Sequence, residues 1–542
     1  MNIKKIEDSF AQTKNKKCSK SKHGMVATAF PNATQAGIDM LQKGGNAVDA
    51  ACAASLALGV CEPQASGLGG QSMAIIYQDG KTVALDGSSR SPSLVHSSKF
   101  TKKRSRVIGY RATTVPSTPV VIGYLNEHFG RLPWSTIIKP AIRIAKRGYR
   151  ITKLQHDLQQ KELENFMKIK SKSGAKYFLK DGEVPYEKND LFVQDDLAET
   201  LQYMSDNGWR TFYHGVISKK INADMIKNNG LLREEDLMMI PDPIERTTIR
   251  RHYRNVTVET MPPPAAGRTL LLVLMMLNHL PSKFLRSGNP NSYHFVAETF
   301  RKALFHRLQN PFNPHTYTKN LDKTHLSRHF ATQLADSIHN TMDDTLPMTP
   351  PEFGGETTHL SVMDDEGNAI GITQSIELAY GSKAAAEGLG FLYNNYISAF
   401  EFENPNHPYF IRPNMIPWTS VSPSFVFHDE KLWIVVGSPG SARIFSTIIQ
   451  FLSRIIDGEL SMKEAVDRPR FHCSASGKIS LEIDGFKPEI IDNLRNLGYE
   501  IDPKERYSFF HGAIHAVMKC QTRNEFHGVA EVRRDGTAGG AD

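Results

Sequence analysis

The 542-residue sequence is poor in cysteine, with five residues that are scattered and odd in number: Cys18, Cys52, Cys61, Cys473 and Cys520. Neither a CxxC pair nor an HExxH motif occurs. This distribution argues against both a disulfide framework and a zinc site, which need paired or closely spaced ligands. We therefore expect a protein without a structural or catalytic metal.

Long apolar segments are also missing. The longest apolar run, Thr269 to Leu277, is too short to span a bilayer. The first 17 residues lack the apolar core of a secretory signal. From these two observations we expect a cytoplasmic protein that does not contact a membrane.

The charge balance is only mildly basic, with 65 Lys and Arg against 57 Asp and Glu and a formal net charge of +8. Part of the excess lies in the run Lys14 to Gly24. A short basic run is typical of a solvated tail, so we expect residues 1–22 to be disordered. No nucleic-acid partner is expected, and the remaining chain is long enough for a sizeable core.

What the sequence does contain is a series of strand and helix patterns. The stretch His23–Tyr77 predicts strand, helix, helix and strand, and its second helix, Asn46–Val60, is apolar on nearly every face. Residues from Leu132 to about Leu304 indicate mostly helices, and 310–355 a long mobile connection. Strands that alternate with helices on either side of this connection favour a layered α/β protein.

After this connection, the stretch "GGETTHLSVMDDEGNAIGITQS" (354–375) predicts a β-hairpin. Thr357 and Thr358 are ordinary strand formers in the simplest interpretation. The alternative is that the chain is cut between Glu356 and Thr357. An N-terminal threonine carries its own general base, an α-amine with a pKa of about 8, beside its hydroxyl nucleophile.

A second stretch, "VVGSPGSARI" (435–444), runs from a strand through a glycine turn into a helix. Such a turn directs backbone N–H groups at one point, where an anion is stabilised. The Gly-Lys-Ser/Thr ending of a phosphate loop is missing. An oxyanion hole for acyl transfer needs the same geometry.

Many ordered motifs accompany these two stretches, and together they resemble the γ-glutamyltranspeptidase family of N-terminal-nucleophile hydrolases. The resemblance runs from about His23 to Gly540. It includes the motifs "GGNAVDA" (44–50), "EPQASGLGG" (62–70), "VPSTP" (115–119), "FGRLPW" (129–134), "PAIRIAKRGY" (140–149), "MPPPAAG" (261–267), "TTHLSVMDDEGNAIGITQS" (357–375), "LYNNYISAF" (392–400), "SVSPS" (420–424), "GSPGSARI" (437–444) and "GVAEVRRDGTAGG" (528–540).

The resemblance implies a four-layer αββα sandwich made as one precursor that cleaves itself. The products would be a large piece, 23–356 with the preceding tail, and a small piece, 357–542, held together as a heterodimer. Thr357 would then attack an amide of a small-molecule substrate, and water or an amine acceptor would resolve the acyl-enzyme. Neither a metal nor an organic cofactor is implied.

The resemblance also assigns site residues. Ser375 occupies the position of a second threonine that hydrogen-bonds the nucleophile, and Gly440 and Ser441 that of a Gly-Gly oxyanion hole. Thr419 and Ser420 correspond to a Ser-Ser pair that contacts substrate.

The positions at which the family binds the α-carboxylate and the α-ammonium group of a γ-glutamyl substrate carry different residues in this chain. Ser88 stands where the family has an arginine for the α-carboxylate, and Ala399 where it has an acid for the α-ammonium. Glu377 replaces an asparagine. Arg90, two residues beyond Ser88, is a candidate for binding a carboxylate, and a structural salt bridge is its alternative role. Glu377 either selects a cationic group or faces solvent.

Three functions remain open at this point. The first is a self-processing amidohydrolase or acyltransferase with altered acyl-donor recognition. The second is an ordinary γ-glutamyl hydrolase or transpeptidase that acts on glutathione, with Arg90 and Glu377 compensating for the lost contacts. The third is an uncleaved, non-catalytic scaffold, which the retained Thr357, Ser375 and glycine loop disfavour.

Overall fold

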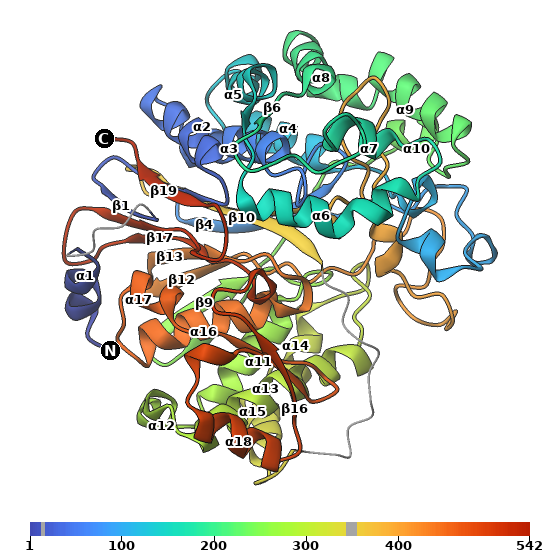
Figure 1. Cartoon of the computed structure of the whole chain (residues 1–542). Coiled ribbons are helices and arrows are strands. Elements are labelled where there is room, and N and C mark those ends of the chain that lie inside the picture. Colours follow the sequence, from blue (N-terminus) through green and yellow to red (C-terminus); the bar gives the residue numbers. More distant parts are fainter. Residues whose placement is uncertain (12–16, 343–354) are drawn as a thin grey trace.

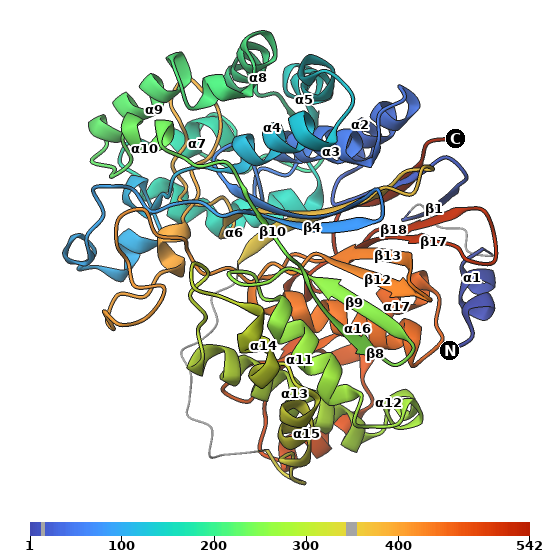
Figure 2. The same ribbon diagram turned by 180° about the vertical axis from the view of Figure 1, so that it is seen from behind.

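Two seven-stranded antiparallel sheets lie face to face, and each carries a layer of helices on its outer side (Figure 1). The computed structural model of the protein describes residues 1–11, 17–342 and 355–542. Both ends of the chain lie near the same edge of the two sheets (Figure 2). The arrangement is the αββα sandwich expected from the sequence.

The first sheet contains the predicted hairpin at its centre. Its strands, in spatial order, are β19 (Thr537–Gly540), β2 (Met25–Thr28), β10 (Glu356–Met363), β11 (Ala369–Glu377), β3 (Gln71–Gln78), β4 (Lys81–Gly87) and β7 (Ile244–Arg246). Every residue of β10 is buried, because helices cover one face of this central strand and the second sheet covers the other.

The second sheet contains the strand that leads into the glycine turn. Its spatial order is β1 (Cys18–Ser21), β18 (Phe526–Val529), β17 (His515–Lys519), β13 (Lys431–Gly437), β12 (Ser424–His428), β9 (Val256–Thr260) and β8 (Ile249–Tyr253). A small sheet of β14 (Phe471–Cys473), β15 (Lys478–Glu482) and β16 (Glu500–Lys504) lies apart from it, as does the pair β5 (Tyr149–Arg150) and β6 (Leu191–Phe192).

The strands alternate between two cores, as the twofold period of a strand requires. Ile75 and Val435 point into the layer between the sheets, where they join an apolar cluster with Met25, Phe425 and Phe427. Their chain neighbours point outward instead, to the helices on each side. This alternation fixes the register of both sheets, because a one-residue slip would exchange the side chains that face the other sheet with those that face the helices.

The helices over the first sheet come mainly from the N-terminal half. They are α2 (Pro31–Gln42), α3 (Ala47–Cys61), α4 (Thr118–Phe129), α5 (Trp134–Arg147), α6 (Lys153–Met167), α7 (Ser173–Phe178), α8 (Asp195–Asn207), α9 (Val216–Lys227) and α10 (Glu234–Met238). Helix α3 is buried along nearly its whole length, as predicted, and begins with a capping box of Asn46 and Asp49.

The helices over the second sheet come from both halves of the chain. They are α11 (Gly267–Leu277), α12 (Ser282–Ser287), α13 (Pro290–Gln309), α14 (Lys319–His325), α15 (Arg328–Asp336), α16 (Ile444–Ile456), α17 (Met462–Asp467) and α18 (Pro488–Asn496). The predicted strand, glycine turn and helix over 431–456 are confirmed as β13, a 3₁₀ turn and α16.

The expectation of a disordered tail over residues 1–22 is wrong for its described part. Ile3–Ala11 forms helix α1, and Cys18–Ser21 pairs with β18. The helix presents Ile6 and Phe10, one turn apart, to the core, and Phe10 stacks on His527 with ring centroids 4.5 Å apart. Burial of apolar side chains at an i, i+4 spacing therefore stabilises this helix in spite of the basic residues in the segment.

The expected mobile connection over 310–355 includes helices α14 and α15. The part of that prediction that concerns residues 343–354 lies outside the described residues.

Both sheets combine strands from before and after the Glu356–Thr357 bond. Strands β2, β3, β4 and β7 precede it in the first sheet, and β10, β11 and β19 contain or follow it. Two pieces separated at this bond would therefore share both sheets. In the described parts of the chain, no helix is long and apolar enough to cross a membrane.

Candidate active site

Thr357 lies at an irregularity at the start of β10. Glu356 pairs with Glu377 and Thr358 with Gln374, so two residues of β11, Ser375 and Ile376, face Thr357 alone. This bulge interrupts the regular ladder at the candidate cleavage site. Bulges of this kind redirect a side chain or the local backbone.

The hydroxyl of Ser375 connects the Thr357 hydroxyl to the carbonyl group of the preceding peptide bond. It accepts a hydrogen bond from Thr357 Oγ1 at 3.2 Å and another from the Glu377 backbone N–H at 2.8 Å. It donates to the carbonyl oxygen of Glu356 at 2.6 Å. Since a serine hydroxyl has one proton and two lone pairs, these three bonds satisfy it completely.

The glycine turn lies beside this bond. A Cβ atom added to Gly355 would come within 2.8 Å of the Ser441 Cβ atom, which places the turn against the residue that precedes Glu356. Gly440 has φ of +124° and Ser441 of +55°. Within the described chain, the backbone N–H groups of these two residues have no hydrogen-bond acceptor, as an oxyanion hole requires.

A buried arginine holds the side chain of the residue before the candidate cleavage point. Arg534, in the segment before β19, pairs with Glu356 at 3.2 Å and with Glu62 at 3.7 Å. Burial raises the pKa of Glu356, against the opposing charge of Arg534, and raises the pKa of Glu62 to about 7. The cluster anchors the chain immediately N-terminal to Thr357.

A cavity of about 560 Å³ opens at Thr357. Of the residues predicted from the sequence, Thr357, Glu377, Thr419, Ser420 and Ser441 line it. Ser375 and Gly440 do not line it, but Ser375 bonds Thr357 and Gly440 directly precedes Ser441. Its other walls come from α13, the 396–407 segment, Trp418 and the start of α16, and consist of Leu304, Arg307, Leu308, Gly355, Tyr396, Ser398, Ala399, Phe400, Glu401, His407, Trp418, Val421, Ala442, Ile444 and Ala475.

Two glutamates line the cavity in different electrostatic states. Burial raises the pKa of Glu377 to about 7, and no hydrogen bond or ion pair to its carboxylate occurs among the described residues. Burial also acts to raise the pKa of Glu401. There, however, three backbone N–H groups (402, 403 and 404) bind the carboxylate and lower its pKa. Glu377 is thus the carboxylate that lacks an internal partner.

Arg90 is not among the residues that line this cavity. With Asp86 and Ser88 it lines a separate, small cavity beside α4, and its guanidinium donates to the carbonyl of Asn414 at 3.4 Å. Asp86 itself pairs with Arg246 at 2.8 Å. This placement does not support the expectation that Arg90 binds the substrate carboxylate.

Known proteins match this chain over most of its length. The sequence matches the Gamma-glutamyltranspeptidase family model over residues 33–541. The chain belongs to the γ-glutamyltranspeptidase family. The glutathione hydrolase proenzyme of Escherichia coli (strain K12) is 31% identical over 96% of this chain and 92% of its own length. The Acylase ACY 1 proenzyme of Pseudomonas sp. (strain V22) is 29% identical over 84% of each chain.

Among solved structures, cephalosporin acylase from Bacillus halodurans superposes with a TM-score of 0.88 over 98% of both chains, at 25% identity. The family resemblance and the fold expected from the sequence are therefore confirmed. As a member of the γ-glutamyltranspeptidase family, the protein is an N-terminal-nucleophile enzyme of the hydrolase and acyltransferase class.

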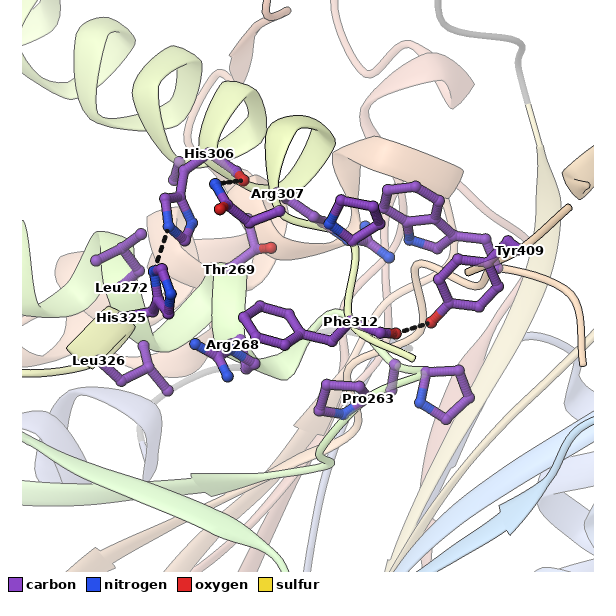
Figure 3. A pocket seen from close by; sticks show the side chains of 16 residues that line it. Pro263, Arg268, Thr269, Leu272, His306, Arg307, Phe312, His325, Leu326 and Tyr409 are labelled. Atoms are coloured by element: carbon purple, nitrogen blue, oxygen red, sulfur yellow. Dashed lines mark hydrogen bonds between the residues drawn. The ribbon is translucent and has the colours of Figure 1, made fainter. Parts of the chain in front are cut away.

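The sequence analysis did not predict most of the other wall residues, among them Tyr396 and Arg307. Tyr396 lies within the quoted "LYNNYISAF" motif, and burial raises its pKa far above the usual value. Arg307 of α13 belongs to no motif, so nothing in the sequence marked it. Arg307 also borders a neighbouring cavity of about 30 Å³, where His306 bonds His325 and Tyr409 bonds the carbonyl of Phe312 (Figure 3).

One group of possible metal ligands occurs in the described residues, Cys520, Glu525 and His527, and it lies outside the Thr357 cavity. His527 bonds Glu525 through Nε2, and its buried Nδ1 has no partner. A metal-bound histidine normally donates its other ring N–H to an acceptor. The group therefore lacks the surroundings of a metal site.

Proposed function

We propose that the protein is a proenzyme that cleaves itself between Glu356 and Thr357. The resulting N-terminal threonine hydrolyses or transfers the acyl group of a small-molecule amide. The observation that carries this proposal is the bonding of Ser375, which joins the Thr357 hydroxyl to the carbonyl oxygen of Glu356.

Self-cleavage follows from this arrangement in balanced steps. Thr357 Oγ1 bonds to the carbonyl carbon of Glu356, its proton passes to Ser375 Oγ, and the Ser375 proton moves to the carbonyl oxygen. The N–H groups of Gly440 and Ser441 stabilise the charge that develops on that oxygen. Breakage of the C–N bond, with a proton returned to nitrogen, leaves an ester and a free α-amine. Water then hydrolyses the ester and releases residues 1–356 from 357–542.

The mature enzyme would use the same groups on substrate. The α-amine of Thr357 accepts the hydroxyl proton as Oγ1 attacks the amide carbonyl, and it returns the proton to the leaving amine. Water, or an acceptor amine, then attacks the acyl-enzyme. Thr357 thus supplies both the nucleophile and the base, and Gly440 and Ser441 supply the oxyanion donors.

We infer that recognition of the acyl donor differs from that of the glutathione hydrolases. Ser88 and Ala399 lack the charges that a γ-glutamyl group requires at these positions, and Arg90 lines a different cavity. Glu377 offers a carboxylate to a cationic group on the donor, and Thr419 and Ser420 form the adjoining wall.

The intact mass of the purified protein tests the processing step. We expect two fragments that meet at Glu356–Thr357 in the wild type and one full-length chain in Thr357→Ala. Turnover of acyl 4-nitroanilides should appear only in the cleaved protein. A single full-length wild-type chain, with no turnover of any anilide, would favour the scaffold function instead.

A further inference from the structure

A groove on the outer surface of the protein, lined by residues from the segments 135–147 of α5 and 202–205 of α8, has a volume of about 540 Å³. Both views show the two helices side by side in the outer helix layer (Figures 1 and 2). We propose that this α5–α8 groove binds a small molecule that carries two or more phosphate groups. None of the residues that line the groove also lines the Thr357 cavity. Ligand binding there is therefore independent of the proposed Thr357 chemistry.

The sequence of α5 separates apolar and basic residues onto two sides of the helix. The buried side consists of Ile137, Ile138, Pro140, Ala141, Ile144 and Ala145. The other side carries basic residues at an i, i+4, i+7, i+8 spacing, which places them on one face of an α-helix. These residues are Lys139, Arg143, Lys146 and Arg147, and all four are exposed and line the groove.

Few opposing charges neutralise this basic face. Lys139, Lys146 and Arg147 form no hydrogen bond or ion pair with the described residues. Arg143 pairs with Asp39 of α2 at 3.1 Å. Among the described residues that line the groove there is no aspartate or glutamate. A concave surface lined by charges of one sign concentrates ions of the opposite sign, so the groove attracts anions.

Polar groups add hydrogen-bond donors to these cations. The hydroxyls of Ser135 and Thr136 on α5 and of Ser205 on α8 line the groove and have no partner in the described part of the chain. The Gln202 amide donates to Asp206 at 2.8 Å, and this aspartate does not line the groove. Hydroxyl, ammonium and guanidinium groups all donate to phosphate oxygens, and the guanidinium often does so bidentately. The groove thus offers a ligand cations and hydroxyl donors but no carboxylate.

The length of the basic face sets the number of anionic groups that a ligand needs. Lys139 and Arg147 lie on α5 about 12 Å apart along the helix axis, from a rise of about 1.5 Å per residue. One phosphate group cannot contact both ends, so a ligand that uses the whole face needs at least two. The volume of the groove falls in the range of about 300–1,000 Å³ that is typical of small-molecule sites. Ile142 is the only aliphatic side chain among the described lining residues, which favours a polar ligand.

Titration of the purified protein with inorganic tripolyphosphate, followed by isothermal calorimetry, tests this site. We expect one binding site, and orthophosphate at the same ionic strength should bind at least about tenfold more weakly. Lys139→Gln/Lys146→Gln should weaken tripolyphosphate binding at least about tenfold, because two charge-assisted contacts are lost. Arg147→Gln alone should weaken it about threefold or more. Since these side chains have no described partner, the thermal unfolding of the variants without ligand should change little.

A matched variant separates a local site from the net positive charge of the chain. Lys103→Gln/Lys283→Gln removes the same charge from two exposed lysines outside the groove, and its affinity for tripolyphosphate should stay within about twofold of wild type. Equal losses in the two double variants would overturn the assignment, because binding would then follow net charge alone. Absence of tripolyphosphate binding, or equal affinities for tripolyphosphate and orthophosphate, would overturn it as well.

A macromolecular polyanion is the competing occupant. A 20-base-pair DNA duplex should bind more weakly than tripolyphosphate under the same conditions. Tighter binding of the duplex that Lys139→Gln/Lys146→Gln abolishes would make the groove a nucleic-acid surface and overturn the proposal. The Thr357→Ala protein should bind tripolyphosphate as the wild type does, because both helices precede Glu356. Failure of tripolyphosphate binding would therefore leave the proposed function untouched, and failure of self-cleavage would leave the groove untouched.

Discussion

Removal of the Ser375 hydroxyl tests whether this group activates the scissile bond. Ser375→Ala deletes the donor to the Glu356 carbonyl oxygen, at 2.6 Å, and the acceptor of the Thr357 hydroxyl, at 3.2 Å. Loss of a single donor to a developing oxyanion slows acyl transfer by about 10²- to 10³-fold. The loss of the proton acceptor adds to this effect, so we expect self-cleavage to slow at least about 100-fold.

The assay is a time course of precursor and fragments on a denaturing gel, started when the protein is freshly synthesised or refolded. Ser375→Thr is the matched variant, because it keeps the hydroxyl. Its cleavage rate should stay within about tenfold of wild type. A thermal unfolding curve for each precursor shows whether the substitution has damaged the fold.

Cleavage of folded Ser375→Ala at the wild-type rate would refute proton transfer through Ser375. The hydrogen bonds of Ser375 would then have only a structural role. Equal slowing in the Ala and Thr variants would refute it as well, since only one of them lacks the hydroxyl.

Three further predictions concern charged side chains of the site. Because burial raises the pKa of Glu377 to about 7, its carboxylate ionises between pH 6 and 8. The kcat/KM ratio of γ-glutamyl to glutaryl 4-nitroanilide should therefore rise up to about tenfold over this range, and Glu377→Gln should abolish the rise. The same raised pKa makes ionised Glu377 destabilising, so Glu377→Gln should increase the free energy of unfolding by about 1–3 kcal/mol at pH 8 and by little at pH 4. Arg534→Gln leaves Glu356 and Glu62 unpaired, which should cost about 3–5 kcal/mol of stability and slow self-cleavage.

Each of these predictions has a clear contrary result. A substrate ratio that does not change with pH in the wild type would show that Glu377 does not contact the α-ammonium group. A stability difference at pH 4 as large as that at pH 8 would show that packing, and not ionisation, distinguishes Glu377→Gln. Rapid cleavage of Arg534→Gln would show that the ion pair does not position Glu356.

Strong local patterns in the central elements were sufficient to predict a layered α/β protein, and the family resemblance implied the four αββα layers. The hairpin around the Asp-Glu-Gly-Asn turn, the buried helix α3 and the β13–turn–α16 unit all occur where they were predicted. Strands β7, β8 and β9 were missed within a region predicted as mostly helical. The edge strand β7 is short and pairs only with β4, which lies far away in the sequence. Strands β8 and β9 form a local hairpin, which the sequence analysis did not recognise.

The site was predicted only in part, for a similar reason. Thr357, Ser375 and Ser441 lie in motifs, Glu377 lies two residues beyond one, and the fold brings the four together. Arg307 comes from a helix without a motif, and only tertiary packing places it beside Thr419. Arg90 has the right chemistry and is close to Ser88 in sequence, but its strand connection leads into a different cavity.

The most direct test of the central claim is to trap the acyl-enzyme. The purified protein is mixed with the acyl 4-nitroanilide that it turns over fastest, quenched in acid during turnover, digested and analysed by mass spectrometry. We predict that the fragment beginning at residue 357 carries one acyl group as an ester on the Thr357 hydroxyl, and that Ser375→Ala reduces its formation. An acyl group on any other residue, or turnover without acylation of Thr357, would contradict the account.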